Sequence, residues 1–188
     1  IATVFRNERI KDAVMDLLNN RDGLILGICN GFQALIKLGL VPFGEIRDIT
    51  EDMPTLTYNN IGRHMSSIVR TKITSNLSPW FSEVNVGDIQ NVAISHGEGR
   101  FVASQEVIKS LFKNGQIATQ YVDFEGNASM NMPYNPNGSM MAIEGITSLD
   151  GRVLGKMGHS ERIGSGLYKN VEGNYDIGMF RSAVEYFK

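Results

Sequence analysis

Apolar residues recur along the chain with two different periods, which predict a mixture of helices and strands. Apolar positions three and four apart, which share one face of a helix, recur in four segments. These segments are residues 6–20, a stretch that begins near Asn30 and runs through Phe32, Leu35 and Ile36, residues 104–114 and residues 178–187. Short apolar or alternating runs predict strands at residues 24–26, 68–73, 92–95, 116–122, 140–146 and 152–157.

Glycine, asparagine and proline separate these elements. Gly39 follows the second helical segment, where a left-handed residue would end it. Residues 97–99 and the Asp150-Gly151 pair predict turns, and residues 125–139 predict an ordered loop rather than a linker. The mixed pattern favours an α/β sandwich, with buried strands in the centre of the sheet and some antiparallel strands in the middle region.

Composition limits the classes of function. A chain of 188 residues is long enough for one domain, and its net charge of −2 gives no basic face for nucleic acid or a membrane surface. The sequence has no apolar run near the ~20 residues that span a bilayer. Cys29 is the only cysteine, so no internal disulfide forms. A lone thiol fits a reducing compartment, and we expect a cytoplasmic protein.

That cysteine stands in a motif suited to a nucleophile. Residues 27–31 read Gly-Ile-Cys-Asn-Gly between a predicted buried strand and a predicted helix, the layout of a nucleophile elbow with cysteine in place of serine. A thiol at a helix N-terminus is expected to gain thiolate character. The backbone N–H of Asn30 is placed to donate to an oxyanion. The alternative is an inert buried cysteine, which is the more common state of a free cysteine.

A nucleophilic cysteine needs a base, and the chain offers three histidines. His159 and Glu161 end a predicted strand, where residues two apart point to the same side, so Glu161 is expected to orient the imidazole. His96 with Glu98 is a second possible acid–base pair, and His64 is interpreted as structural or on the surface. Because no two of these residues show the short spacing of metal ligands, we expect no metal site.

These residues occur in a pattern that resembles class I (triad-type) glutamine amidotransferases. Residues 27–33, Gly-Ile-Cys-Asn-Gly-Phe-Gln, are similar to the nucleophile motif of that family. Residues 135–139, 143–145 and 155–162 resemble the C-terminal signature of one branch, phosphoribosylformylglycinamidine synthase, and residues 95–101 are similar to a further stretch of it. The similarity spans the whole chain.

The resemblance implies a flavodoxin-like glutaminase domain that hydrolyses glutamine to glutamate and ammonia. It assigns the triad to Cys29, His159 and Glu161. Substrate contacts fall to Asn30, Gly31, Gln33 and His96, although His96 could equally be structural or face a synthetase. Residues 59–60 and 62–63 would lie beside the substrate. The ammonia would pass to a synthetase domain that makes formylglycinamidine ribonucleotide in purine biosynthesis. The chain itself needs no cofactor, and ATP and Mg²⁺ are expected in the synthetase.

The resemblance also implies that residues 1–188 form the C-terminal glutaminase domain of a larger enzyme. The start at Ile1–Ile10 resembles the form in which synthetase and glutaminase are fused in one polypeptide. Two departures stand out. The family commonly has prolines on both sides of the histidine, where this chain has Gly158 and Ser160. The first strands of the domain, with a glycine-rich loop that supplies a second oxyanion donor, are expected to be missing.

Two other functions remain open at this point. One is a different cysteine-elbow hydrolase of the same fold, such as an intracellular cysteine peptidase or a thiol-dependent stress protein. The other is a docking or structural fragment that is inactive alone. Glutamate release from free glutamine, compared with cleavage of peptides, distinguishes the two enzymes.

Overall fold

The computed structural model describes residues 2–175 and 178–188. Residue 1, the first of the stretch compared above with fused enzymes, lies outside them. The helices are α1 (Ala2–Phe5), α2 (Glu8–Asn19), α3 (Asn30–Leu38), α4 (Leu40–Phe43), α5 (Gln105–Lys113) and α6 (Met179–Glu185), with 3-10 turns η1 (Pro79–Phe81) and η2 (Met140–Ala142). The strands are β1 (Ile25–Ile28), β2 (Thr55–Tyr58), β3 (Met65–Ile73), β4 (Ile89–His96), β5 (Glu98–Val102), β6 (Ile117–Tyr121), β7 (Ile143–Thr147) and β8 (Val153–Lys156).

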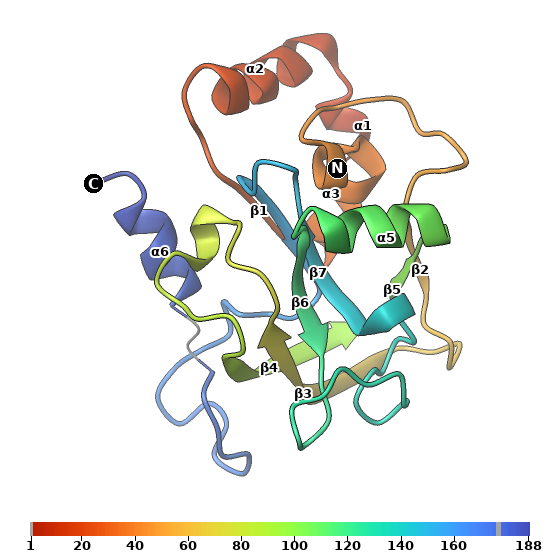
Figure 1. Cartoon of the computed structure of the whole chain (residues 1–188), viewed down its shortest axis with the longest axis vertical. Helices are drawn as coiled ribbons and strands as arrows, with labels where there is room; N and C mark the ends of the chain where they lie inside the picture. Colours follow the sequence, from red (N-terminus) through yellow and green to blue (C-terminus); the bar gives the residue numbers. More distant parts are fainter. Residues whose placement is uncertain (1, 176–177) are drawn as a thin grey trace.

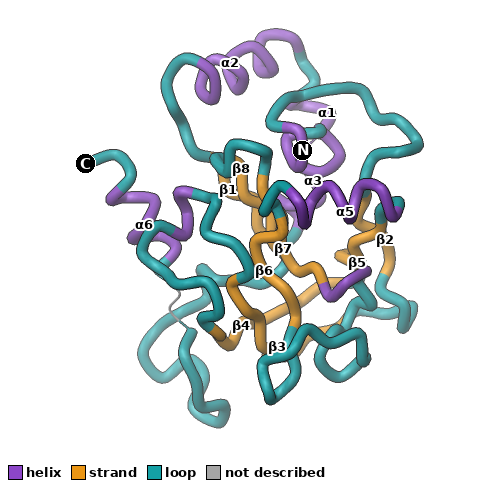
Figure 2. The backbone as a smooth tube through the Cα atoms, viewed as in Figure 1, coloured by secondary structure: helices purple, strands orange, loops and turns teal. Residues whose placement is uncertain are grey.

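Six strands form the main sheet in the order β1-β8-β7-β6-β3-β4 (Figures 1 and 2). The β1–β8 pair is parallel, and the other pairs in this sheet are antiparallel. A separate two-stranded sheet pairs β2 with β5. The expected α/β sandwich of the flavodoxin-like type, with antiparallel strands in its middle region, is confirmed. The sheet places the C-terminal ends of β1 and β8 side by side, with Ile28 opposite Lys156.

The two faces of the sheet carry separate apolar cores. Phe32 of α3 and Leu111 of α5 pack with Val153 on one face. Leu154, the next residue of β8, packs with Met179 of α6 on the other face. Figure 1 shows α6 on the opposite side of the strands from α3 and α5. Successive strand residues point to opposite faces of the sheet. Because both faces are covered, strands such as β8 are buried on both sides and are mostly apolar.

Most predicted helices and strands are present with ends shifted by a few residues, but two local predictions are wrong and one strand was missed. Glu98 and Gly99 were expected in a turn and instead begin β5. Met140–Ala142 forms a 3-10 turn in place of the start of a strand. The strand β2 was not predicted, because its four residues give too short a pattern and only Leu56 is buried.

The asparagine-rich loop at residues 125–139 is ordered, as expected, and supports β5. Asn135, Asn137 and Ser139 are fully buried. The Asn137 side-chain amide donates to Gly99 O at 2.9 Å, and the Ser139 hydroxyl accepts from the Phe101 backbone N–H at 3.0 Å. Buried polar side chains that satisfy backbone groups hold irregular structure in place. The loop therefore holds the backbone of β5 in position.

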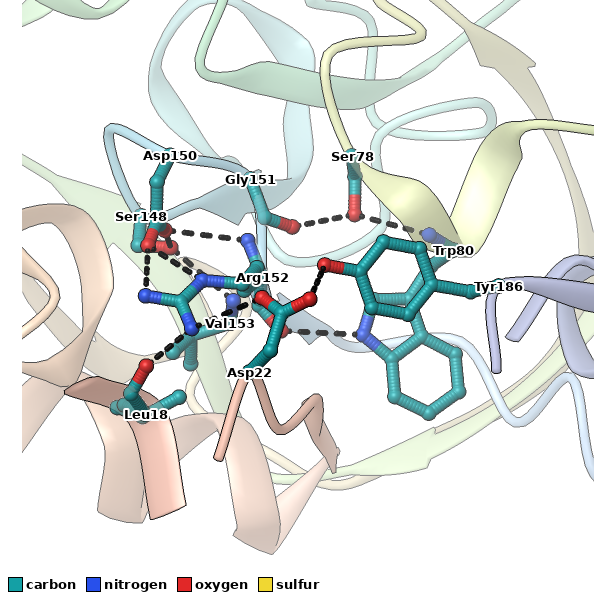
Figure 3. Close-up of polar contacts among 10 residues, drawn as sticks. All are labelled: Leu18, Asp22, Ser78, Trp80, Ser148, Asp150, Gly151, Arg152, Val153 and Tyr186. Carbon is teal, nitrogen blue, oxygen red and sulfur yellow. Dashed lines mark hydrogen bonds and ion pairs between the residues drawn. The ribbon is translucent and has the colours of Figure 1, made fainter. Parts of the chain in front are cut away.

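Arg152 joins distant parts of the chain at the turn between β7 and β8 (Figure 3). Its guanidinium donates to Leu18 O at the end of α2 and pairs with Asp22 at 3.4 Å and Asp150 at 2.8 Å. Asp22 also accepts from the hydroxyl of Tyr186 at 2.8 Å, so the N-terminal and C-terminal helices meet at this turn.

Candidate active site

Cys29 lies in a tight turn between β1 and α3. Its φ of 53° and ψ of −107° are unusual for a residue with a side chain. The turn brings α3 close to β1, since a Cβ atom on Gly27 would lie 2.7 Å from the backbone carbon of Gly31. Gly27 is therefore required for the close approach, whereas a Cβ atom on Gly31 would have no neighbour within 4 Å. The strand–turn–helix layout expected of a nucleophile elbow is present.

A cavity of about 730 Å³ opens beside this turn. Its wall includes these residues singled out in the sequence: Cys29, Asn30, Gln33, His96, Glu98 and His159. Gly62 and Arg63, from the segment expected beside the substrate, also line it. Gly31 is not in its wall. Glu161 reaches the cavity only through His159. The fold thus brings residues from β1, α3, β4 and the segment after β8 to one hollow.

His159 and Glu161 are in contact, although not through the geometry that the sequence indicated. Strand β8 ends at Lys156, and the chain turns so that the Arg162 N–H donates to His159 O at 3.1 Å. The turn places Glu161 Oε1 2.6 Å from His159 Nδ1, with the His159 backbone N–H held by Ala93 O at 2.8 Å. The expectation of an extended backbone from His159 to Glu161 is therefore wrong, but the expected contact between the two side chains is present.

This contact determines which ring nitrogen of His159 is available. A carboxylate accepts from Nδ1–H, so the neutral ring keeps its lone pair on Nε2. Nε2 is buried and has no hydrogen-bond partner among the described residues. A ring nitrogen with a free lone pair beside the cavity that holds Cys29 has the requirements of a general base.

The surroundings of the Cys29 thiol shift its pKa in opposite directions. Burial raises its pKa, and this effect outweighs the Asn30 backbone N–H and the charge of Arg162, which both lower it. The thiol donates weakly to Ser95 O, at 3.8 Å from Sγ. This direction opposes the thiolate character that was expected for a thiol at a helix N-terminus. A base must take the thiol proton when the thiol reacts.

Gln33 and His96 are held by neighbours that the sequence did not identify. The Gln33 side-chain amide donates to Glu98 O at 3.0 Å. His96 Nδ1 lies 3.2 Å from Asn59 Oδ1, so the structure pairs His96 with Asn59 rather than with the Glu98 carboxylate. Asn59 is itself oriented, because its Nδ2 donates to His96 O at 2.8 Å and Arg63 O at 3.0 Å. Its oxygen thus faces His96, whose Nδ1 must carry the proton.

Burial makes His96 a group that resists protonation. Burial lowers the pKa of His96 to about 4. The charge of Glu144 opposes this shift, and the charges of His64 and His159 add to it. The unfolded chain binds a proton near pH 6.5 while the folded chain does not, so folding stability falls as pH drops from about 6.5 to 4. His96 should account for about 3 kcal/mol of that loss.

The measurement is urea unfolding between pH 7 and pH 4 for the native chain and His96→Asn. We expect the variant to lose much of the pH dependence. His64→Gln, which changes an exposed histidine, is the matched control and should keep it. Equal pH dependence in the native chain and His96→Asn would contradict the assignment.

Arg162 and His64 belong to the cavity wall but were not assigned to the site from the sequence. Arg162, next to Glu161, lines the cavity with its positive charge. His64, interpreted as structural or on the surface, is exposed and also lines the cavity, with Nε2 3.0 Å from the hydroxyl of Ser95. The signal for Arg162 in the sequence was its place beside Glu161, within residues 155–162.

Residues 2–175 and 178–188 contain no group of three or more histidine, cysteine or acidic side chains arranged to hold a metal ion. Over the same residues, every helix is too short or too polar to cross a bilayer.

Known proteins share both the sequence pattern and the fold of this chain. Residues 1–187 match the model of the CobB/CobQ-like glutamine amidotransferase domain. A solved structure described as PurLQS from Thermotoga maritima superposes with a TM-score of 0.71 at 26% identity, covering 100% of this chain and 72% of that one.

Curated relatives are named phosphoribosylformylglycinamidine synthase subunit PurQ. The relative from Methanococcus maripaludis strain C7 is 35% identical over 95% of this chain and 72% of its own length. The relative from Synechococcus elongatus is 34% identical over 87% of this chain and 62% of its own length, and that from Chlorobaculum tepidum is 38% identical over 79% and 58%. The match in sequence, fold and elbow leads to one conclusion: the chain belongs to the family of CobB/CobQ-like glutamine amidotransferase domains.

Proposed function

We propose that residues 1–188 act as a glutaminase domain that hydrolyses glutamine to glutamate and ammonia, with Cys29, His159 and Glu161 as its catalytic triad. The observation that carries the proposal is the shared cavity, where the elbow cysteine meets a histidine whose Nδ1 is bound by Glu161 and whose Nε2 is free. The family and the names of the relatives support the same reaction.

The proposed reaction begins with a neutral thiol. His159 Nε2 takes the Cys29 proton as the sulfur attacks the carboxamide carbon of glutamine, and the carbonyl oxygen becomes an oxyanion that the Asn30 N–H stabilises. The imidazolium then gives its proton to the amide nitrogen, the carbon–nitrogen bond breaks, and ammonia leaves a glutamyl thioester. His159 next takes a proton from water as the water oxygen attacks the thioester carbon. The carbon–sulfur bond then breaks, glutamate leaves, and the imidazolium returns its proton to the sulfur.

The remaining site residues are proposed to bind the substrate. Gln33 is fixed by Glu98 O, so its carbonyl oxygen is free to accept from glutamine. Gly31 leaves open space at the start of α3. Neutral His96 lines the cavity and carries a lone pair on Nε2, which makes it an acceptor for substrate N–H groups.

The ammonia is proposed to reach a synthetase that forms formylglycinamidine ribonucleotide in a reaction that uses ATP and Mg²⁺. The curated relatives are named as subunits, so they do not support the earlier expectation that the synthetase belongs to the same polypeptide. The solved PurLQS structure is consistent with a partner chain.

The experiment is to follow glutamate release by the chain with its synthetase partner, on glutamine and on a panel of peptides. We expect glutamate and ammonia in equal amounts from glutamine and no cleavage of peptides. Peptide cleavage without glutamine hydrolysis would instead favour the cysteine-peptidase alternative. Neither reaction, in a complex that still makes product from added ammonia, would favour an inactive docking role.

A further inference from the structure

A fully buried ion pair lies beneath the segment that carries His159. Lys156, the last residue of β8, and Glu144 of β7 both have side chains with 0% exposure, and Nζ lies 3.3 Å from Oε1. The pair lies at the C-terminal end of β8, because Lys156 is two residues before Gly158 in the chain. The mechanism proposed above gives neither residue a role.

The pair is bound to the backbone before His159 and to a side chain after it. Lys156 Nζ donates to Gly158 O at 2.9 Å and to the hydroxyl of Ser160 at 2.9 Å. Glu144 Oε1 accepts from the Gly158 backbone N–H at 2.5 Å, and the Glu144 backbone O accepts from the Met157 N–H at 3.2 Å. Three hydrogen bonds thus hold the residues directly before and after the histidine, and the fourth holds Met157.

The other contacts of Glu144 tie the pair to the rest of the sheet. Glu144 Oε2 accepts from the hydroxyl of Thr119 on β6. The pair therefore connects the His159 segment to three adjacent strands, β6, β7 and β8. A side-chain network in which every charged group is satisfied rigidifies the structure around it.

Stability alone does not account for this arrangement. Removing two charges from water is costly, and buried ion pairs are often replaced by apolar residues without loss of stability. Where such pairs serve a purpose, it is to specify one arrangement over others. In this chain the pair binds the Gly158 backbone and the Ser160 hydroxyl, so the arrangement that it specifies is that of the segment around His159.

We propose that the Glu144–Lys156 pair positions the catalytic imidazole by fixing the segment from Gly158 to Ser160. Both are positioning residues, since they act through that segment. The proposal rests on the proposed glutaminase function.

The two departures from the family pattern fit this role. Proline at position 158 would have no N–H to donate to Glu144, and proline at position 160 would have no hydroxyl to accept from Lys156. A Cβ atom on Gly158 would also lie 2.9 Å from Glu144 Oε1 and 2.7 Å from a methyl of Val92. Proline would restrict the backbone beside His159 through its ring. In this chain, hydrogen bonds from the Glu144–Lys156 pair restrict it instead.

The test is the double variant Glu144→Gln/Lys156→Met. The glutamine amide can still accept from the Gly158 N–H, so the fold should be retained, while both bonds from Nζ are lost. We expect kcat for glutamine to fall about 10²-fold, the cost of misplacing a catalytic group by about 1 Å, with KM changed much less. Synthesis from added ammonia by the complex should be unaffected.

A second readout does not depend on glutamine. The rate at which iodoacetamide alkylates Cys29, measured against pH, reports how readily the thiol loses its proton. With His159 displaced, the profile should move to higher pH. If the native chain fails to hydrolyse glutamine but its profile shifts in the variant, the proposed function is wrong and the positioning role survives.

The matched control is Arg152→Met, at the other end of the same β hairpin. It removes a polar anchor with ion pairs to Asp22 and Asp150 (Figure 3), so it should lower the melting temperature. Both the alkylation profile and kcat should stay as in the native chain, which separates lost stability from lost positioning.

Ser160→Ala is a second variant, for the case in which the double variant does not fold. It removes one acceptor of Nζ and should lower kcat several-fold while shifting the alkylation profile in the same direction. Native kcat and a native alkylation profile in whichever variant folds would overturn the proposal.

Discussion

Replacing Cys29 by alanine is expected to abolish glutamine-dependent synthesis while leaving synthesis from added ammonia intact. Without the thiol no thioester forms, and loss of the nucleophile lowers turnover by about 10⁶ in a protease whose residues act as a unit. The sulfur donates one weak hydrogen bond, to Ser95 O, and packs in the apolar core beside α3. Alanine removes only this atom, so the fold should be retained. The measurement is product formation by the complex with each nitrogen source.

The ammonia-dependent rate is the internal control of this experiment. Because the proposed synthetase chemistry does not use Cys29, that rate reports whether the complex still assembles. If both rates are lost, Cys29 is required for the structure rather than for the chemistry. If both are kept, another group attacks glutamine.

Changing Glu161 to glutamine should have the second largest effect. An amide in place of the carboxylate can donate to Nδ1 of His159, which favours the ring tautomer with its proton on Nε2 and removes the base. In a serine protease the equivalent change costs about 10⁴ in kcat. Glu161 is 44% exposed, and water can replace part of its effect, so we expect a loss of 10²–10⁴-fold, roughly.

The measurement is kcat for glutamine hydrolysis, with the circular dichroism spectrum as a check on the fold. Glu45→Gln is a suitable control, because Glu45 is an exposed carboxylate with an arginine partner, like Glu161, but lies away from the cavity. Unchanged turnover in Glu161→Gln would remove Glu161 from the triad. Glu98 would then be the next carboxylate to replace.

The sequence was most informative where one local pattern determines the structure. The helix α3 follows from the spacing of Phe32, Leu35 and Ile36 and ends at Gly39, which has a φ of 84°. Strands such as β2 depend on a partner far along the chain, here β5, and their own residues carry little signal. Glycine in residues 97–99 favoured a turn, but pairing with β2 places Glu98 and Gly99 in a strand.

The candidate site was predictable to the same extent. Cys29, His159 and Glu161 stand in short motifs, so their meeting at one cavity could be anticipated. Their environment could not, because it depends on distance in space. The buried thiol, the Asn59 partner of His96 and the ion pair of Glu144 with Lys156 join residues from separate strands and loops. The sequence signals for the ion pair were a lysine and a glutamate, each inside a buried strand run.

The backbone at Cys29 implies that function and folding favour different residues at position 29. A positive φ costs a residue with a side chain about 1–3 kcal/mol, and glycine largely escapes that cost. Glycine would therefore suit the turn better, and only the sulfur chemistry favours cysteine. The strain places the nucleophile where substrate can reach it, so the chain gives up conformational stability at the very residue on which its chemistry depends.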